Sequence, residues 1–310
     1  GITIIDPKKK DKARFTYLTM KNGMPDNIIR EIKADAKGMI WVATADAGVC
    51  IIDPNTLKAR QLLNWTFGPV NSLILTTVNE LWIGTRDNGL IIYNPSTGAY
   101  KNVKSLKDEV YRLAEDHEGN IVLSTATGFY QYSGDRFAFI TQDDGLPAPD
   151  VTAVYVDRQN RYWVGTGKGL AVMTPNNSGG VDVRQIPLPG GALQIKAIQE
   201  DKYGYIWVGA LGRGLYRLDP NTLTPQGYDA GRGLSSNDVS CLAAAPDGTL
   251  YVGTLGGGLT AVRIGEGGAV GGLARVVEET GALGEYIYAL LVVRGALAGT
   301  FWVTFRRIST

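Results

Sequence analysis

One short apolar phrase recurs seven times along this 310-residue chain, and its spacing is nearly constant. In five copies the phrase is built around a tryptophan, and in two a valine or a tyrosine takes that place. The seven anchor residues are Trp41, Trp82, Val122, Trp163, Trp207, Tyr251 and Trp302. Successive anchors lie 41, 40, 41, 44, 44 and 51 residues apart. A sustained period of this length indicates a repeat architecture in which every repeat forms one small structural unit.

The residues that flank each anchor repeat as well. Three residues before every anchor stands a glycine or an asparagine, the types that accept positive φ in a tight hairpin. Four repeats have an aspartate three residues earlier still, where its carboxylate can bond the backbone of the turn: Asp35, Asp116, Asp157 and Asp201. A glycine, a second apolar run and often a proline-containing turn follow the anchor. Each repeat is therefore predicted to form four short strands.

Seven four-stranded antiparallel units of about 40–50 residues are typical of a β-propeller. No segment keeps an apolar period of 3.6 residues over three turns, so we expect an all-β chain with almost no helix. Residues 1–310 are predicted to form one seven-bladed propeller. The anchor tryptophans are expected to pack between neighbouring blades, where each can bury about 150–250 Å².

The first residues of the chain indicate how the ring closes. The opening phrase GITIIDP (1–7) repeats as GVCIIDP (48–54), which is the third strand of a repeat. Only eight residues follow the last anchor, Trp302, so that repeat lacks its third strand. We expect residues 1–6 and 14–18 to supply the third and fourth strands of blade 7, and 289–293 and 300–305 to supply the first and second. Residues 1–19 would then complete a 2+2 closure that removes an open sheet edge.

Composition excludes several partners. Charge is almost balanced, with 31 basic and 30 acidic residues, which gives no indication of a nucleic acid or an anionic membrane as a partner. The first apolar run is too short for a signal peptide, and the longest, 286–293, is too short to span a bilayer. We expect no membrane insertion by this chain. Cys50 and Cys241 fall inside apolar runs and are predicted to be buried free thiols.

Three segments carry a resemblance to a known family. GMPDNIIREIKADAKGMIWVAT (23–44), GLPAPDVTAVYVDRQNRYWVGTGKGL (145–170) and GLSSNDVSCLAAAPDGTLYVGTLGGGL (233–259) resemble the two-component regulator propeller repeat. That family forms the extracytoplasmic sensor region of hybrid two-component sensor kinases. The resemblance implies a ligand-sensing role, a periplasmic or extracellular location, and a second propeller or a downstream signalling module as partner. More distantly, the repeat is similar to streptogramin lyase-type propellers, whose catalysis relies on histidines.

The sequence offers little for catalysis. It contains no histidine pair, no Cys/His pair and no metal-ligand spacing, so we predict no catalytic residue, no metal and no cofactor. The one histidine, His117, lies where the repeat places a hairpin turn. Propellers bind ligands at the mouth of the central channel, so a histidine on the opposite face would argue against a lyase.

Candidate binding residues lie near the channel mouth. The second residue of each predicted inner strand varies and is mostly polar: Arg30, Asn71, Tyr111, Thr152, Lys196, Ser240 and Tyr288. The loops on the same face add Asp46, Trp65, Arg86, Asp87, Lys168 and Arg213. Polar donors combined with aromatic rings suit sugars or other polar small ligands, and the basic members would tolerate an anionic group.

These observations favour a non-catalytic module that recognises a glycan fragment, an oligosaccharide or another small polar ligand at the channel mouth. Two alternatives remain open at this point. One is a lyase or hydrolase that acts on a polysaccharide or a cyclic peptide at the same face. The other is a protein-interaction scaffold, or an engineered or recombined propeller, without a small-molecule ligand. Propellers host all three kinds of function, so the fold does not choose among them.

Overall fold

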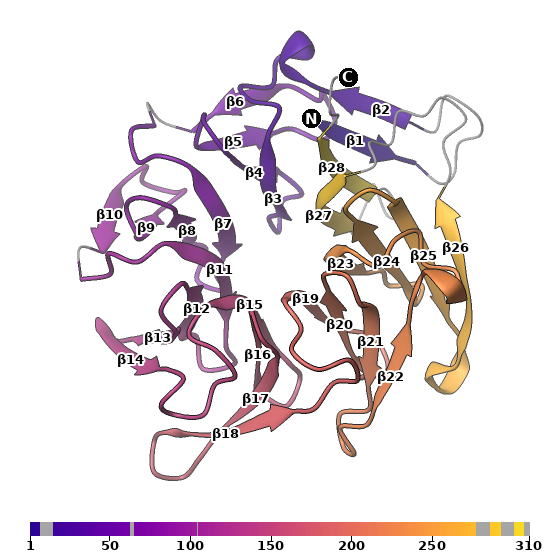
Figure 1. Cartoon of the computed structure of the whole chain (residues 1–310). Helices are drawn as coiled ribbons and strands as arrows, with labels where there is room; N and C mark the ends of the chain where they lie inside the picture. The colour runs from indigo at the N-terminus through magenta and orange to yellow at the C-terminus, as the bar shows by residue number, and fades with distance from the viewer. Residues whose placement is uncertain (7–14, 63–64, 104, 277–285, 293–300, 307–310) are drawn as a thin grey trace.

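The described strands form seven four-stranded antiparallel sheets arranged as a ring around a central channel (Figure 1). The computed structural model describes residues 1–6, 15–62, 65–103, 105–276, 286–292 and 301–306. The predicted seven-bladed β-propeller is confirmed. Within these residues the helical segments are three short 3-10 turns: η2 (Met20–Asn22), η3 (Ala230–Arg232) and η4 (Glu266–Gly268). None of them has the length or apolar character that a membrane crossing requires.

Blades 1 to 6 each use four consecutive strands, ordered from the channel outward. Blade 1 contains β3 (Ile29–Ala34), β4 (Ile40–Thr44), β5 (Val49–Ile52) and β6 (Ala59–Gln61). Blade 2 contains β7 (Val70–Leu75), β8 (Leu81–Thr85), β9 (Leu90–Tyr93) and β10 (Tyr100–Val103). Blade 3 contains β11 (Val110–Glu115), β12 (Ile121–Thr125), β13 (Phe129–Ser133) and β14 (Arg136–Ile140).

The second half of the ring repeats this order. Blade 4 contains β15 (Val151–Val156), β16 (Tyr162–Thr166), β17 (Leu170–Pro175) and β18 (Val181–Ile186). Blade 5 contains β19 (Ile195–Glu200), β20 (Ile206–Ala210), β21 (Gly214–Leu218) and β22 (Pro225–Tyr228). Blade 6 contains β23 (Val239–Ala244), β24 (Thr249–Thr254), β25 (Gly258–Ile264) and β26 (Val270–Val276).

Blade 7 is assembled from both ends of the chain. Its sheet order is β2 (Phe15–Leu18), β1 (Ile2–Ile5), β28 (Phe301–Arg306) and β27 (Tyr286–Val292). β1 lies antiparallel to β28, with Ile4 opposite Trp302, so the predicted 2+2 closure is confirmed. The inner strand begins at Tyr286, three residues before the predicted start. The predicted range 289–293 was too short, although Tyr288 was already among the predicted inner-strand positions; it is an extra residue that interrupts the register between Ile287 and Ala289.

The repeated aspartate holds both the hairpin and the anchor tryptophan. In blade 4, Asp157 Oδ1 accepts hydrogen bonds from the backbone N–H groups of Gln159 and Arg161, both at 2.9 Å. Its Oδ2 accepts the indole N–H of Trp163 at 2.8 Å. The same arrangement joins Asp35 to Trp41 and Asp201 to Trp207. The turn role of the aspartate was predicted, whereas its bond to the indole was not.

Blades 2 and 3 depart from this arrangement. In blade 2 the aspartate is replaced by Thr76, and the indole of Trp82 donates to Glu80 at 3.1 Å instead. In blade 3 the anchor is a valine without a polar group. Asp116 Oδ2 therefore accepts the hydroxyl of Tyr162, from the next blade, at 2.9 Å. The buried acceptor has a partner in every one of these cases, as buried polar groups require.

Each anchor tryptophan whose side chain is described packs against the following blade. Trp41 belongs to the apolar cluster of blade 2, Trp82 to that of blade 3, and Trp207 to that of blade 6. The predicted role in packing between blades is confirmed for these residues. The side chain of Trp302 lies outside the described part of the structure. Cys50 and Cys241 are buried free thiols, as predicted.

In four repeats the residue two positions after the anchor is a glycine, and it lies where two blades approach closely. A Cβ added to Gly165 would lie 2.5 Å from Ile195 on the inner strand of the next blade, and one added to Gly209 would lie 2.4 Å from Val239. Distances this short are not tolerated between carbon atoms. Glycine is required here because blades must pack closely, whereas its freedom in a turn plays no part.

Candidate functional site

The inner strands of all seven blades surround one cavity of about 350 Å³ along the ring axis (Figure 1). These strands are β3, β7, β11, β15, β19, β23 and β27. Each begins at the face that carries the loops between blades and ends at the face that carries the first hairpin of its blade. We call the first of these ends the mouth of the channel. Every candidate in the inner strands was predicted to lie there.

A bulge interrupts every inner strand near its start, at the second residue in blades 1 to 6 and at the third residue of β27 in blade 7. In β3, Ile29 lies opposite Thr44 and Glu31 lies opposite Ala43, which leaves Arg30 as an extra residue. The same shift occurs in the other six blades, at Asn71, Tyr111, Thr152, Lys196, Ser240 and Tyr288. A bulge redirects the side chains beside it. The variable polar positions found in the sequence are therefore the seven bulge residues.

The bulge residues of blades 2, 4 and 6 are small, and each bonds the inner strand of the next blade. The amide of Asn71 donates to the carbonyl of Val110 at 3.1 Å, and it also bonds Glu109. The hydroxyl groups of Thr152 and Ser240 donate to the equivalent carbonyls of blades 5 and 7. These polar groups hold the ring together. The structure therefore gives Asn71 and Thr152, both predicted as ligand contacts, a structural role.

The bulge residues of the odd-numbered blades are long. Three of them line the cavity: Arg30, Lys196 and Tyr288. The fourth, Tyr111, lies at the mouth beside Glu109 and Asp150. Burial, followed by these two carboxylates, raises the pKa of Tyr111. Because seven is odd, the alternation of long and small residues breaks between blades 7 and 1, so two neighbouring blades there both carry a long bulge residue.

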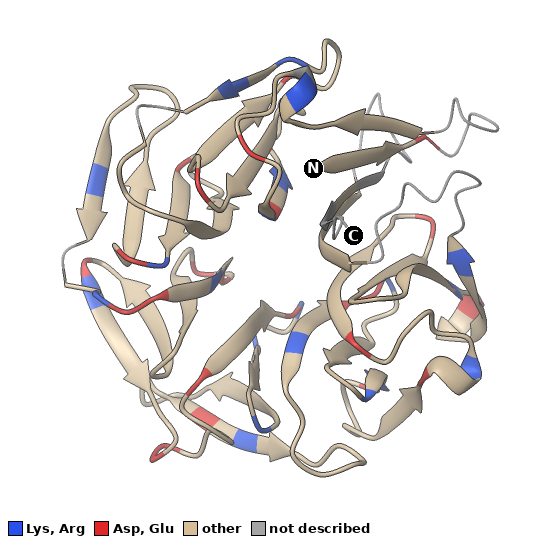
Figure 2. Cartoon of the chain, turned by 45° about the horizontal axis from the view of Figure 1, so that its top comes forward, with Lys and Arg blue, Asp and Glu red and all other residues tan. Residues whose placement is uncertain are grey.

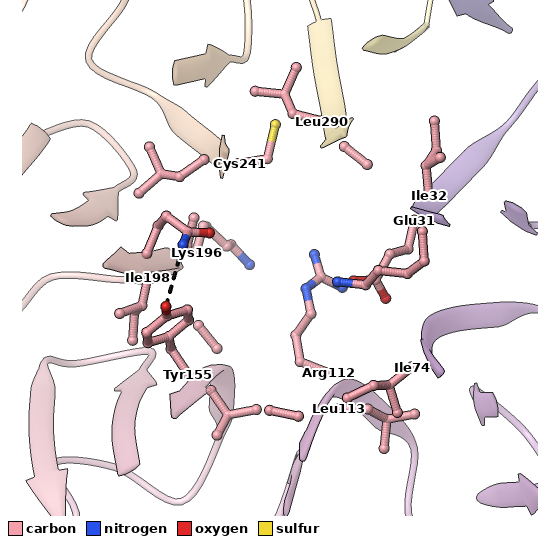
Figure 3. Close-up of a pocket in the computed structure, with 18 of the residues that line it drawn as sticks. Glu31, Ile32, Ile74, Arg112, Leu113, Tyr155, Lys196, Ile198, Cys241 and Leu290 are labelled. Carbon is pink, nitrogen blue, oxygen red and sulfur yellow. Dashed lines mark hydrogen bonds and ion pairs between the residues drawn. The ribbon is translucent and has the colours of Figure 1, made fainter. Parts of the chain in front are cut away.

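The residue that follows each bulge was missed by sequence reasoning, and in every blade except blade 2 it lines the cavity. Five of the seven are small: Ser72, Ala153, Ala197, Cys241 and Ala289. Glu31 in blade 1 and Arg112 in blade 3 are the exceptions, and both line the cavity (Figure 3). A usable signal was present in the sequence, because a charged residue stands at two positions where the other repeats have a small one.

The carboxylate of Glu31 is fully engaged. It accepts the backbone N–H of Leu73 in blade 2 at 2.8 Å and lies 3.1 Å from the ammonium group of Lys33. Burial alone would raise the pKa of Glu31. Lys33, Arg112 and the hydrogen bonds from Ser72 and Leu73 together outweigh burial and hold that pKa below its usual range. Glu31 therefore remains ionised and links blade 1 to blade 2 through its hydrogen bond to Leu73.

Arg112 and Lys196 point into the channel from blades 3 and 5 (Figure 3). Arg112 Nη1 donates to the carbonyl of Tyr111 at 2.8 Å and approaches that of Asn71 at 3.5 Å. Burial lowers the pKa of Lys196, the positive charge of Arg112 lowers it further, and Asp150 partly opposes both effects. The positive charges of Arg112 and Lys196 therefore repel each other across the cavity.

At the far end of the channel, hydrogen bonds from glutamate side chains join neighbouring blades. Glu115, the last residue of β11, accepts the backbone N–H of Thr77 at 2.9 Å and its hydroxyl at 2.7 Å. Glu200 accepts the backbone N–H of Arg158 in the same way, at 3.0 Å. His117 is exposed in a hairpin on this face, opposite the mouth. The only histidine of the chain therefore cannot act at the mouth.

The predicted loop residues lie outside the cavity. The indole of Trp65 donates to the carbonyl of Gly68 at 2.6 Å, and its ring covers the turn at Gly48, where a Cβ would lie 2.1 Å from it. Trp65 is therefore a packing residue rather than a free stacking platform. Arg86 and Asp87 form an exposed pair with each other at 3.0 Å. The remaining three, Asp46, Lys168 and Arg213, are exposed on turns.

Neither the distribution of charged residues nor that of metal-ligating side chains indicates a second binding site in the described residues. Figure 2 shows Lys and Arg interspersed with Asp and Glu around the described part of the ring. Within the described residues, no group of three or more His, Cys, Asp or Glu side chains is placed to hold a metal ion. The channel is thus where long polar side chains converge.

Comparisons with known proteins agree with the architecture. Residues 145–168 and 233–256 match the family model described as two component regulator propeller. The predicted resemblance is confirmed for these two repeats. A search of curated proteins found no significant match.

Two structures of one lyase share the fold, and a third structure was compared as well. Virginiamycin B lyase from Staphylococcus aureus is 13% identical over 98% of both chains, with a TM-score of 0.69. A catalytically inactive histidine-to-alanine variant of that lyase, solved with quinupristin, is 14% identical over 92% of this chain and 98% of that one, again with a TM-score of 0.69. The extracellular domain of a protein described as a one component system from B. thetaiotaomicron is 18% identical over 95% of this chain and 55% of that one, with a TM-score of 0.47.

Proposed function

We propose that this chain is a non-catalytic binding module that recognises a small polar ligand, such as a glycan fragment, at the mouth of its central channel. One observation carries the proposal. Arg30, Lys196 and Tyr288 border the cavity from three blades, and their side chains form no hydrogen bond or ion pair with the part of the chain that the structure describes. Side chains that are both convergent and structurally free are typical of ligand sites.

The family resemblance supports a sensing role for this module. Its repeats match a family whose members act as extracytoplasmic sensor regions, so we propose a periplasmic or extracellular location and a signalling module or a second propeller as partner. A histidine-dependent lyase reaction is not proposed, because His117 lies on the opposite face. The inactive lyase variant lacks a histidine, which indicates that the lyase itself depends on one.

Thermal melting in the presence of oligosaccharides tests this proposal. A ligand that binds only the native state at 100 times its Kd adds about 2.7 kcal/mol of stability. We expect one class of oligosaccharide to raise the Tm of the native protein and of the control Arg184→Gln, whose side chain is exposed on outer strand β18. Tyr288→Ala and Arg30→Gln should melt normally without ligand and lose that shift. A millimolar panel of neutral and acidic oligosaccharides without any shift would refute the proposal.

A further inference from the structure

We infer that the channel holds an oxyanion site in which Arg112 and Lys196 together bind one carboxylate or phosphate group of the ligand. The inference specifies the proposed function further. It rests on that function only for the part of the ligand that is not the anionic group. Binding of the anion itself can be tested alone. The site lies below the mouth, where the residues that follow the bulges line the cavity in every blade except blade 2.

The surroundings leave room between the two cations. Arg112 comes from β11 and Lys196 from β19, and the strand between them is β15. The third residue of β15 is Ala153, a small residue that leaves the space in front of it open. Figure 3 shows both head groups directed toward the middle of the cavity. An anion in that space would meet a guanidinium on one side and an ammonium on the other.

The carboxylates of the channel offset this pair only in part, because Glu31 interacts with the charge of Arg112 and Asp150 with that of Lys196, and neither forms a direct ion pair with them. Glu31 is engaged by Lys33 and by the backbone of the next blade, and Glu115 is engaged by Thr77. Among the described residues, Lys196 forms no hydrogen bond or ion pair. The hydrogen bonds of Arg112 involve Nη1 alone, which leaves Nε and Nη2 available.

The pair is destabilised while no anion is present. Two like charges that face each other in a partly desolvated cavity repel, and desolvation disfavours the charged form of each. The lowered pKa of Lys196 has these two causes. An anion placed between the two groups removes the repulsion and replaces lost hydration. The electrostatics of the cavity therefore favour a negatively charged ligand.

The chemistry of the two side chains defines the occupant further. A guanidinium presents parallel N–H groups that match two oxygens of a carboxylate or a phosphate, and an ammonium group adds a point charge. A cavity of about 350 Å³ lies within the range of small-molecule sites. It therefore suits a compact oxyanion such as the carboxylate of an acidic sugar or the phosphate of a sugar phosphate.

Titration of defined probes at constant ionic strength tests the inference. The probes are inorganic phosphate, sodium D-glucuronate, D-glucose 6-phosphate and neutral D-glucose. The variants are Arg112→Gln and Lys196→Gln. Each has a control that removes the same type of charge elsewhere: Arg184→Gln on an outer strand and Lys37→Gln in a hairpin on the far face, both exposed. Binding is followed by calorimetry and by the shift in Tm.

We expect at least one anionic probe to bind the native protein and both controls. Each channel variant should weaken it by about 10-fold or more, the loss expected for a charged hydrogen-bonding partner. Lys196→Arg should retain binding. A preference for glucuronate would indicate a carboxylate ligand, and a preference for phosphate or glucose 6-phosphate would indicate a phosphorylated one.

Three results would overturn the inference: no anion binds, an anion binds the channel variants as tightly as the controls, or Lys196→Arg fails to bind although it folds. A neutral oligosaccharide that binds all variants equally while no anionic probe binds would overturn it as well and leave the proposed function intact. Conversely, anion binding that depends on Arg112 and Lys196 would support it even where no oligosaccharide binds. Should Arg112→Gln not fold, Lys196→Gln and Lys196→Arg decide the outcome.

Discussion

Replacing Asp157 by alanine should destabilise the whole ring, because one carboxylate holds a hairpin, an anchor indole and an arginine. The side chain is 2% exposed. It accepts two backbone N–H groups at 2.9 Å, the indole of Trp163 at 2.8 Å and Arg161 Nε at 2.7 Å. Removal of one partner from a buried ion pair costs about 3–5 kcal/mol, and every buried donor left without an acceptor costs about 1–3 kcal/mol. Because water can reach the turn and Arg161 keeps its bond to the carbonyl of Pro220, we expect a loss of about 4 kcal/mol.

Differential scanning calorimetry measures this loss. An unfolding entropy of about 2.1 cal/mol/K per residue gives about 0.65 kcal/mol/K for this chain, so 4 kcal/mol lowers the Tm by about 6 °C. The matched control is Asp53→Ala. Asp53 also accepts a backbone N–H in a turn, from Asn55 at 2.9 Å, but it is only half-buried and holds no indole. Equal shifts for the two variants would refute the view that the second carboxylate oxygen anchors the blade.

Four further outcomes follow from the fold. Deletion of residues 1–19 should destabilise the whole domain by more than about 5 kcal/mol, because β1 alone buries three isoleucines; unchanged melting would contradict the closure. Trp207→Ala should cost about 3–5 kcal/mol in urea unfolding, since its ring is fully buried between blades. Asn71→Ala should lower stability by about 1–3 kcal/mol through the lost bonds to blade 3, and an unaffected Tm would return this residue to the binding set. Burial raises the pKa of both Cys50 and Cys241 to about 12. Each thiol should resist alkylation until the protein unfolds, and the stability that it contributes as a neutral group should decline as pH rises from 9 toward 12.

The architecture could be predicted because its determinants are local and repeated. The positive φ predicted before each anchor is present at Gly38, Asn79, Gly119 and their counterparts in the described residues. The similarity between 1–7 and 48–54 is enough to place the first strand in the seventh blade. Seven copies of the same signal correct one another, so a weak copy such as the one at Val122 is still recognised.

The candidate site was predicted less well. The second residues of the inner strands were found by their variability, yet their roles split between inter-blade bonds at Asn71 and Thr152 and the cavity at Lys196. Propensity and period do not distinguish these roles, because a small hydroxyl and a long ammonium group are both compatible with a strand end. Trp65 was taken for a stacking surface because an aromatic residue in a loop has no visible partner in sequence.

The amino-acid pattern alone was enough to define seven blades, their strands and the pairing of the two chain ends. Each repeat of about 40 residues contains its own turn residues and apolar runs, which determine its strands locally. The direction of the inner side chains had to come from three-dimensional packing. A bulge shifts the register by one residue and turns neighbouring side chains toward the axis, and ring closure then sets which of them face each other. Arg112 and Lys196 confront each other across the channel for that reason, although they belong to different repeats that do not adjoin.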